Sequence, residues 1–204
     1  MTLPMKHPFT ATLVGPTGCG KTMFIFRLIE HAREMIVPTP ARILYCYGEY
    51  QPIFAKYSAV EFNEGLPDAS QFDGRQAVLV IIDDLMNETN ESVSAIFTKI
   101  SHHRNVSVVY ITQNMFPKNK HARTISLNSH YMVLFKNPRD ADQFAVLARQ
   151  MYPSGSKFAI DAFRDATRVP YGYLLIDLKP ETDEKHRLRS NIFPGEMTSV
   201  YIKK

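Results

Sequence analysis

One short motif constrains this chain more than any other feature of its sequence. Residues 15–22 read Gly-Pro-Thr-Gly-Cys-Gly-Lys-Thr and match the pattern G-x-x-x-x-G-K-[ST]. The motif follows an apolar run of strand length, Phe9–Val14, and opens a segment of helical period, Lys21–Ile36. Its glycines let the backbone wrap an anion with N–H groups, and the helix N-terminus adds a positive dipole. The motif therefore predicts a phosphate-binding loop.

The predicted ligand of this loop is ATP together with Mg²⁺. We expect every residue of the motif to contact the nucleotide, namely Gly15, Pro16, Thr17, Gly18, Cys19, Gly20, Lys21 and Thr22. The ammonium group of Lys21 is expected to reach the β- and γ-phosphates and to act in catalysis. The hydroxyl group of Thr22 is expected to be a ligand of the metal ion.

Two adjacent carboxylates follow the apolar run Ala77–Ile82. A buried strand that delivers an acid at its carboxyl end is the second half of a phosphate-loop site. We expect Asp83 to hold Mg²⁺, directly or through water, and Asp84 to orient or deprotonate the attacking water. Glu49 follows another predicted strand, Arg42–Tyr47, and is the alternative candidate for this base.

A polar residue, Gln113, also follows the predicted strand Val106–Thr112. Its carboxamide is expected to sense the γ-phosphate or to position water. A glutamine at the end of a strand more often bonds to a loop, so this prediction depends on the two motifs that precede it. Together, these strand ends predict a catalytic site at one edge of a sheet.

Apolar runs of strand length alternate with segments of helical period along the chain. The other runs are Tyr131–Phe135 and Tyr173–Leu178, and the other predicted helices are Glu91–His103 and Asp140–Met151. The alternation predicts a three-layer α/β sandwich with a mainly parallel central sheet, which is the RecA-like (ASCE) arrangement of P-loop NTPases. We expect one domain over residues 1–204 with a short basic tail at about 179–204, and residues 48–75 remain unassigned.

The composition excludes several classes of protein. With 45% hydrophobic and 22% charged residues, the sequence is typical of a globular chain and not of a disordered one. Its longest purely apolar run, residues 77–82, is much too short to cross a bilayer, and the first residues lack the pattern of a signal peptide. Cys19 and Cys46 predict neither a disulfide framework nor a zinc site. We therefore expect a reducing, intracellular location without membrane contact.

The motifs, in this order, resemble those of the FtsK–HerA superfamily of P-loop ATPases. The resemblance is strongest to the DNA-packaging ATPases of Polinton/Maverick elements, adintoviruses and related large DNA viruses, including the poxvirus type. It is carried by residues 15–22, 80–85 and 110–114, and by the downstream blocks 120–128, 135–140 and 148–153. All P-loop NTPases share the first motif, whereas the downstream blocks discriminate. The second motif ends in Asp-Asp where the superfamily usually has Asp-Glu, which leaves the identity of the base open.

This resemblance implies a homo-oligomeric ring that moves double-stranded DNA and, in the viral branch, drives a genome into a preformed capsid. It implies a capsid vertex or other packaging proteins as partners, and a location in the nucleus or cytoplasm of a host cell or with the virion. It also favours DNA contacts from the basic segment after Gln113, with Lys118 and Lys120 as the candidates. The net charge of +4 is compatible with such a partner.

A ring motor also requires an arginine that one subunit presents to the γ-phosphate held by its neighbour. Arg104, Arg123 and Arg139 lie near the ends of predicted strands. Arg123 and Arg104 are the first candidates, because they flank the strand that leads to Gln113.

Three alternative functions stay open at this point. A DNA translocase in replication or segregation would use the same site. A P-loop kinase usually carries an arginine-rich lid, and the strand before Gln113 and the blocks after it argue against one. A nucleotide-binding scaffold that barely hydrolyses ATP is supported only by the Asp-Asp ending. A nuclease half is not expected, because the 27 residues after Asp177 hold no cluster of acids for two metal ions.

Overall fold

A computed structural model defines the fold and describes residues 3–83, 85, 90–101, 104–115, 120–139 and 141–203. The strands are β1 (Met5–Lys6), β2 (Thr10–Val14), β3 (Ile36–Val37), β4 (Arg42–Tyr47), β5 (Glu61–Glu64), β6 (Val78–Asp83), β7 (Val106–Thr112), β8 (Tyr131–Phe135), β9 (Tyr173–Asp177), β10 (Leu188–Ser190) and β11 (Ser199–Tyr201). The α-helices are α1 (Lys21–Glu30), α2 (Ala32–Met35), α3 (Asn90–Ala95), α5 (Lys120–Leu127), α6 (Ala141–Met151) and α7 (Ser156–Ala166). A π-helical stretch spans Ile96–Ile100, and short 3₁₀ helices span Pro52–Lys56, Ala69–Gln71 and Glu184–His186.

Within the described residues, the main sheet has the strand order β11-β10-β9-β8-β2-β7-β6-β4-β5. The strands from β8 to β5 in this order are parallel, which confirms the predicted mainly parallel sheet. β9, β10 and β11 join as antiparallel strands beyond β8. β2 lies between β7 and β8, so the strand that leads into the phosphate loop is in the interior of the sheet.

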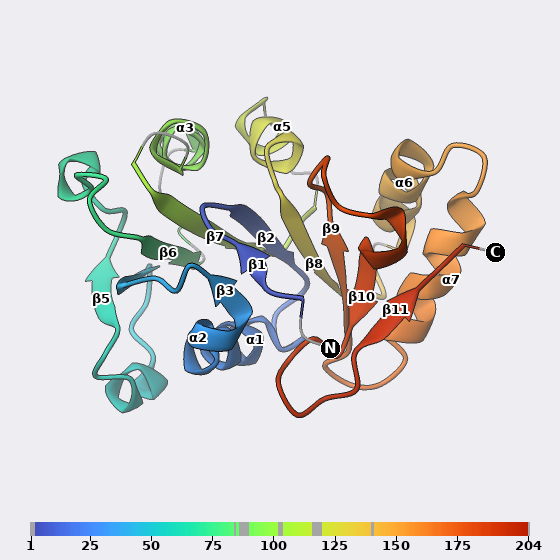
Figure 1. Cartoon of the computed structure of the whole chain (residues 1–204), viewed down its shortest axis with the longest axis horizontal. Coiled ribbons are helices and arrows are strands. Elements are labelled where there is room, and N and C mark those ends of the chain that lie inside the picture. The colour runs from blue at the N-terminus through green and yellow to red at the C-terminus, as the bar shows by residue number, and fades with distance from the viewer. Residues whose placement is uncertain are drawn as a thin grey trace.

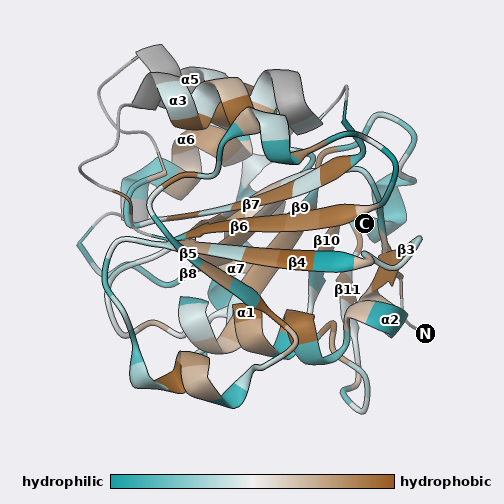
Figure 2. Ribbon diagram, turned by 90° about the vertical axis from the view of Figure 1, so that its left-hand side faces the viewer, coloured by the Kyte–Doolittle hydropathy of each residue, from teal (hydrophilic) through white to brown (hydrophobic). Residues whose placement is uncertain are grey.

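Helices cover both faces of this sheet (Figure 1), with α1 and α2 on one face and α3 and α5 on the other. In β6, Leu79 and Ile81 belong to the core on the side of α1, whereas Val80 and Ile82 pack with the residues of α3. Figure 2 shows these apolar strands between the helical layers. Because the strands are covered on both faces, their sequences are apolar at consecutive positions. The predicted three-layer α/β sandwich is therefore confirmed.

The first predicted helix, Lys21–Ile36, is wrong in its extent. α1 ends at Glu30, α2 follows as a separate short helix, and Ile36 begins β3. The residue that follows β3 is Pro38, and a proline disfavours the helical conformation of the residue before it. β-branched Ile36 and Val37 then extend and pair with β1 instead of continuing the helix.

The second predicted helix, Glu91–His103, begins at Asn90 and changes from α3 to the π-helical stretch at Ile96. Residues 48–75, which the sequence left unassigned, contain the edge strand β5. Part of the expected basic tail is also structured, because β10 and β11 extend the main sheet. No helix among the described residues is long and apolar enough to cross a bilayer.

A buried ion pair attaches this C-terminal segment to the sheet. Nη2 of Arg189 in β10 lies 3.1 Å from Oδ2 of Asp177 in β9, and Nη1 donates to the carbonyl of Leu3 at 3.2 Å. Both charged side chains are almost fully buried. Burial lowers the pKa of Arg189, and the charge of Asp177 opposes this shift. Arg189 thus links β10 to β9 through the ion pair and to the N-terminal residues through its bond to Leu3.

Candidate nucleotide-binding site

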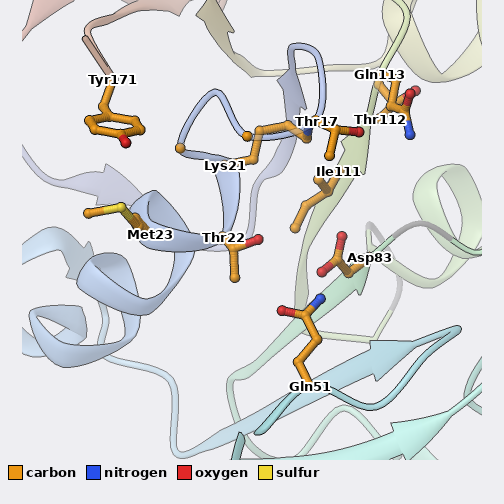
Figure 3. A pocket seen from close by; sticks show the side chains of 12 residues that line it. Thr17, Lys21, Thr22, Met23, Gln51, Asp83, Ile111, Thr112, Gln113 and Tyr171 are labelled. Atoms are coloured by element: carbon orange, nitrogen blue, oxygen red, sulfur yellow. The ribbon is translucent and has the colours of Figure 1, made fainter. Parts of the chain in front are cut away.

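The carboxyl ends of the parallel strands β2, β6 and β7 meet at one edge of the sheet, beside the start of α1. A cavity of about 400 Å³ lies at this edge (Figure 3). It is lined by Thr17, Gly18, Gly20, Lys21, Thr22, Met23, Gln51, Asp83, Ile111, Thr112, Gln113 and Tyr171. The cavity therefore brings together the phosphate loop and the two polar strand ends that the sequence identified.

The path of the phosphate loop requires glycine at two of its positions. Gly15 packs so closely on β8, the strand beside β2 in the sheet, that an added Cβ would lie 2.7 Å from Cβ of Phe135. Gly20 has a φ of 108°, which is a region that favours glycine. A side chain at either position would force the loop to change its course. The sequence motif therefore specifies a particular backbone path between β2 and α1.

The ammonium group of Lys21 is held at this loop. Its Nζ donates to the carbonyl oxygens of Gly15 at 2.5 Å and Pro16 at 3.0 Å. Sγ of Cys19 lies 4.0 Å from the same Nζ. Burial raises the pKa of the Cys19 thiol, although the charge of Lys21 opposes this. Cys19 therefore remains a protonated thiol near neutral pH and contributes packing to the loop.

Asp83, the last residue of β6, lies across the cavity from Thr22 (Figure 3). The phenol of Tyr45 in β4 donates a hydrogen bond of 2.5 Å to its Oδ2. Burial and the neighbouring carboxylate raise the pKa of Tyr45, so the phenol remains a donor at physiological pH. A hydroxyl and a carboxylate are the hard oxygen donors that Mg²⁺ prefers. Thr22 and Asp83 thus have the chemistry and the placement for the predicted metal ligands.

Tyr45 was not predicted from the sequence, and its contact with Asp83 indicates a positioning role. We expect Tyr45→Phe to raise the Mg²⁺ concentration that half-saturates ATP hydrolysis by roughly 10- to 100-fold, because the Asp83 carboxylate loses a hydrogen-bond donor that orients it. The rate at saturating Mg²⁺ should change less. The matched control is Tyr57→Phe, which removes an exposed phenol that donates to Oε1 of Glu30 at 2.7 Å. Equal Mg²⁺ curves for all three proteins would contradict this role.

Gln51 is a second residue of the cavity that the sequence did not reveal. It follows β4, and Figure 3 shows its carboxamide directed toward Asp83.

Glu49, the alternative base, is exposed and is not among the residues that line the cavity. A carboxamide can position water but cannot accept a proton at neutral pH, so Gln51 does not replace Glu49 as a base. Asp84, the first candidate, lies outside the described residues.

Gln113 lines the cavity directly after β7, as the sequence predicted. The opposite end of the cavity is formed by Met23 of α1 and by Tyr171, which precedes β9. Neither residue was predicted. Both belong to large hydrophobic types and are more than half exposed, at 57% and 61%.

The candidate arginines occupy different places. Arg104 precedes β7 at the amino edge of the parallel strands, and its Nη1 donates to the carbonyl oxygens of Phe72 at 2.7 Å and Ala69 at 3.3 Å. Arg139 is exposed and follows β8 at the edge that carries the phosphate loop. For Arg123, in α5, only the backbone is described. Arg104 therefore binds its own chain, away from the nucleotide cavity of the same subunit.

One of the two candidate DNA-binding lysines lies in a helix and not in a loop. Lys120 begins α5, so the basic segment after Gln113 is helical from that residue onward. Lys118 lies outside the described residues, and only the backbone of Lys120 is described. The expectation of a continuous basic loop is corrected to this extent.

No known protein family and no curated protein matches this sequence. Among solved structures, the chain is similar to the genome packaging NTPase B204 from Sulfolobus turreted icosahedral virus 2, solved in complex with ATP-gammaS, at 11% identity and a TM-score of 0.49 over 96% of this chain and 97% of that one. It is also similar to a KaiC-like protein from Pyrococcus horikoshii OT3, at 13% identity and a TM-score of 0.49 over 96% and 91% of the two chains. A third similar structure, EccC (ATPases 2 and 3) from Thermomonospora curvata, has 13% identity and a TM-score of 0.45 over 65% and 31%. The order of the strands and the loop between β2 and α1 place the chain in the three-layer α/β fold of P-loop NTPases.

Proposed function

We propose that this chain is an Mg²⁺-dependent ATPase. The observation that carries the proposal is the meeting of Lys21, Thr22 and Asp83 in one cavity that Gln113 also lines. Lys21 supplies positive charge for the β- and γ-phosphates, while Thr22 and Asp83 supply oxygen ligands for the Mg²⁺ that accompanies ATP. Gln113 contacts the γ-phosphate or the attacking water. Asp84 remains the proposed base, because it directly follows Asp83.

The work performed by this hydrolysis is, in our proposal, the movement of double-stranded DNA into a preformed capsid. The support is the resemblance of the sequence blocks after β7 to the packaging ATPases named above. These blocks lie on α5, at the end of β8 and at the end of α6. The proposed DNA contacts are Lys118, which precedes α5 in the sequence, and Lys120, the first residue of α5. The proposed assembly is a homo-oligomeric ring in which an arginine of one subunit, Arg123 first, completes the site of the next.

The test is ATP hydrolysis by the full chain, measured with and without double-stranded DNA over a range of protein concentrations. We expect turnover to rise with DNA and to increase more than proportionally with protein concentration, because the arginine comes from a neighbouring subunit. Turnover that responds to neither variable would contradict the motor. A protein that neither binds nor hydrolyses ATP would contradict the ATPase itself.

A pair of variants locates the DNA surface in the same experiment. Lys118→Ala combined with Lys120→Ala should weaken DNA binding and reduce the slope of log affinity against log salt by roughly two, since each lost phosphate contact contributes about 0.9. The control combines Lys56→Ala with Lys157→Ala, which removes two exposed lysines elsewhere on the chain. If the first pair leaves the slope of log affinity against log salt unchanged, the segment after Gln113 does not contact DNA.

A further inference from the structure

A tight turn places Tyr171 at the rim of the nucleotide cavity. The backbone N–H of Gly172 donates to the carbonyl of Val169 at 3.1 Å, which closes a turn over residues 169–172. Pro170 holds the second position at negative φ, and Tyr171 has a φ of 62° at the third position. This combination defines a type II turn, whose third position normally requires glycine or asparagine.

Tyr171 is therefore strained where it lies. The other described non-glycine residues with positive φ are Asn105 and Asn191, which are of the type that tolerates this conformation. An asparagine side chain can bond to the nearby backbone, which offsets the close contact of its Cβ with the backbone in this conformation. A tyrosine side chain cannot form this local hydrogen bond. Strain of this kind persists where the surrounding structure imposes it, and it gathers at ligand-binding sites. The turn thus holds an aromatic ring in a place that the backbone alone would not favour.

The ring lies directly over the end of the phosphate loop. A Cβ built on Gly20 would be 3.2 Å from Cδ1 of Tyr171 and 3.3 Å from its Cβ, so the tyrosine packs against the bare backbone of the glycine. Met23, two residues into α1 from the start of the helix, completes this end of the cavity. Figure 3 shows Tyr171 and Met23 on one side of Lys21 and Thr22, with Asp83 and Gln51 on the other side.

With ATP bound as proposed above, this arrangement gives the nucleotide one direction in the cavity. The γ-phosphate belongs at the end of the cavity that holds Asp83 and Gln113, because these residues carry the groups for Mg²⁺ and water. The remainder of the molecule then runs past the start of α1 toward Met23 and Tyr171. An exposed aromatic ring beside a thioether offers a flat, polarisable surface, and aromatic rings bind nucleobases by stacking.

We propose that Tyr171, with Met23 beside it, is the platform on which the nucleobase of the bound nucleotide stacks. The inference rests on the proposed binding of ATP at the phosphate loop. It assigns a binding role to the turn before β9, a segment that no sequence motif marks. The phenol ring, rather than its hydroxyl group, provides the contact.

Two substitutions separate this role from a structural one. Tyr171→Gly removes the ring and relieves the strain, so the protein without nucleotide should melt at the same or a higher temperature. The same variant should bind ATP roughly 5- to 100-fold more weakly, because a stacked base is lost. Its affinity for inorganic tripolyphosphate, which has no base, should not change. Tyr171→Phe should keep the affinity of the original protein for both ligands.

The measurements are calorimetric titrations with ATP and with tripolyphosphate. A 2-aminopurine nucleoside triphosphate gives a second readout, because its fluorescence is quenched by stacking and the chain contains no tryptophan. We expect quenching with the original protein and with Tyr171→Phe, and none with Tyr171→Gly.

The control is Val169→Ala, in the same turn. Val169 lines a second cavity of about 380 Å³, together with Cys19 and Lys136, and Tyr171 borders both cavities. If Val169→Ala weakens ATP binding and Tyr171→Gly does not, the base lies in the second cavity and the proposal is overturned.

Equal loss of ATP and tripolyphosphate binding in Tyr171→Gly would overturn it too, because the turn would then only shape the phosphate loop. An original protein that binds tripolyphosphate but not ATP would overturn the platform, and one that binds neither would overturn the proposed ATPase and the platform together.

Discussion

Replacing Lys21 with methionine is expected to reduce ATP hydrolysis by roughly 100- to 1000-fold, because the γ-phosphate loses a fixed positive charge as negative charge develops on it. Lys21 has no substitute among the residues that line the described cavity, since none of the others there carries a positive charge. Methionine keeps most of the length of the side chain. Hydrolysis is measured at saturating Mg²⁺ and ATP, so the loss reports the chemical step and not only binding.

The fold of this variant should survive. The ammonium of Lys21 bonds to the carbonyl oxygens of Gly15 and Pro16, which belong to the loop and not to the core. The melting temperature should therefore stay close to that of the original protein. Lys157→Met serves as the control, since Lys157 is exposed on α7 and pairs with Asp161 on the same helix. Normal hydrolysis by Lys21→Met would show that the turnover comes from another site or from a contaminant.

The second large effect is on stability. Asp177→Ala should lower the free energy of unfolding by about 3–5 kcal/mol, because it leaves the guanidinium of Arg189 buried without its charge partner. This is a large part of the roughly 5–15 kcal/mol that stabilises a typical domain. Urea unfolding should show a lower midpoint with an unchanged slope.

A double variant distinguishes a lost partner from a lost contact. Combining Asp177→Ala with Arg189→Met removes both charges and leaves apolar groups, so most of the lost stability should return. Lys157→Ala, which breaks an exposed pair on α7, should have no measurable effect. If the double variant is less stable than Asp177→Ala alone, the guanidinium acts mainly through its bond to the carbonyl of Leu3.

The strands of the central sheet could be predicted closely because each is buried on both faces. The runs Arg42–Tyr47, Val106–Thr112 and Tyr131–Phe135 coincide with β4, β7 and β8. An apolar run of this length gives a signal that does not depend on knowing the neighbouring strand. The phosphate loop is similar, since its glycines and lysine are specified by local backbone shape.

The edge strands could not be predicted because they lack the long apolar runs of strands that are buried on both faces. β5 reads Glu-Phe-Asn-Glu and is partly solvated, so its sequence resembles that of a loop. β10 and β11 have three residues each, and β10 follows a polar segment. Their place in the sheet is decided by tertiary contacts such as the pair of Asp177 and Arg189, which no local pattern reveals.

The sequence motifs named several of the residues that line the cavity but not the two that turns bring to it. Lys21, Thr22, Asp83 and Gln113 lie at or next to the ends of regular elements. Gln51 and Tyr171 reach the cavity only because of how the chain turns after β4 and before β9. The Pro170–Gly172 sequence does contain a turn signal, but its type II geometry became visible only with the φ of the tyrosine between them.

The interior position of β2 also has a consequence for the order in which the chain acquires structure. Thr10 of β2 pairs with Val108, a separation of 108 − 10 = 98 residues, and Ala11 pairs with Tyr131, a separation of 131 − 11 = 120 residues. Every residue of β2 is buried in the finished sheet. Contacts this distant form slowly, and a growing chain exposes such a strand until its partners exist. The phosphate loop is thus synthesised before β7 and β8, and its supporting strand gains both neighbours only after β8 (Tyr131–Phe135) has left the ribosome.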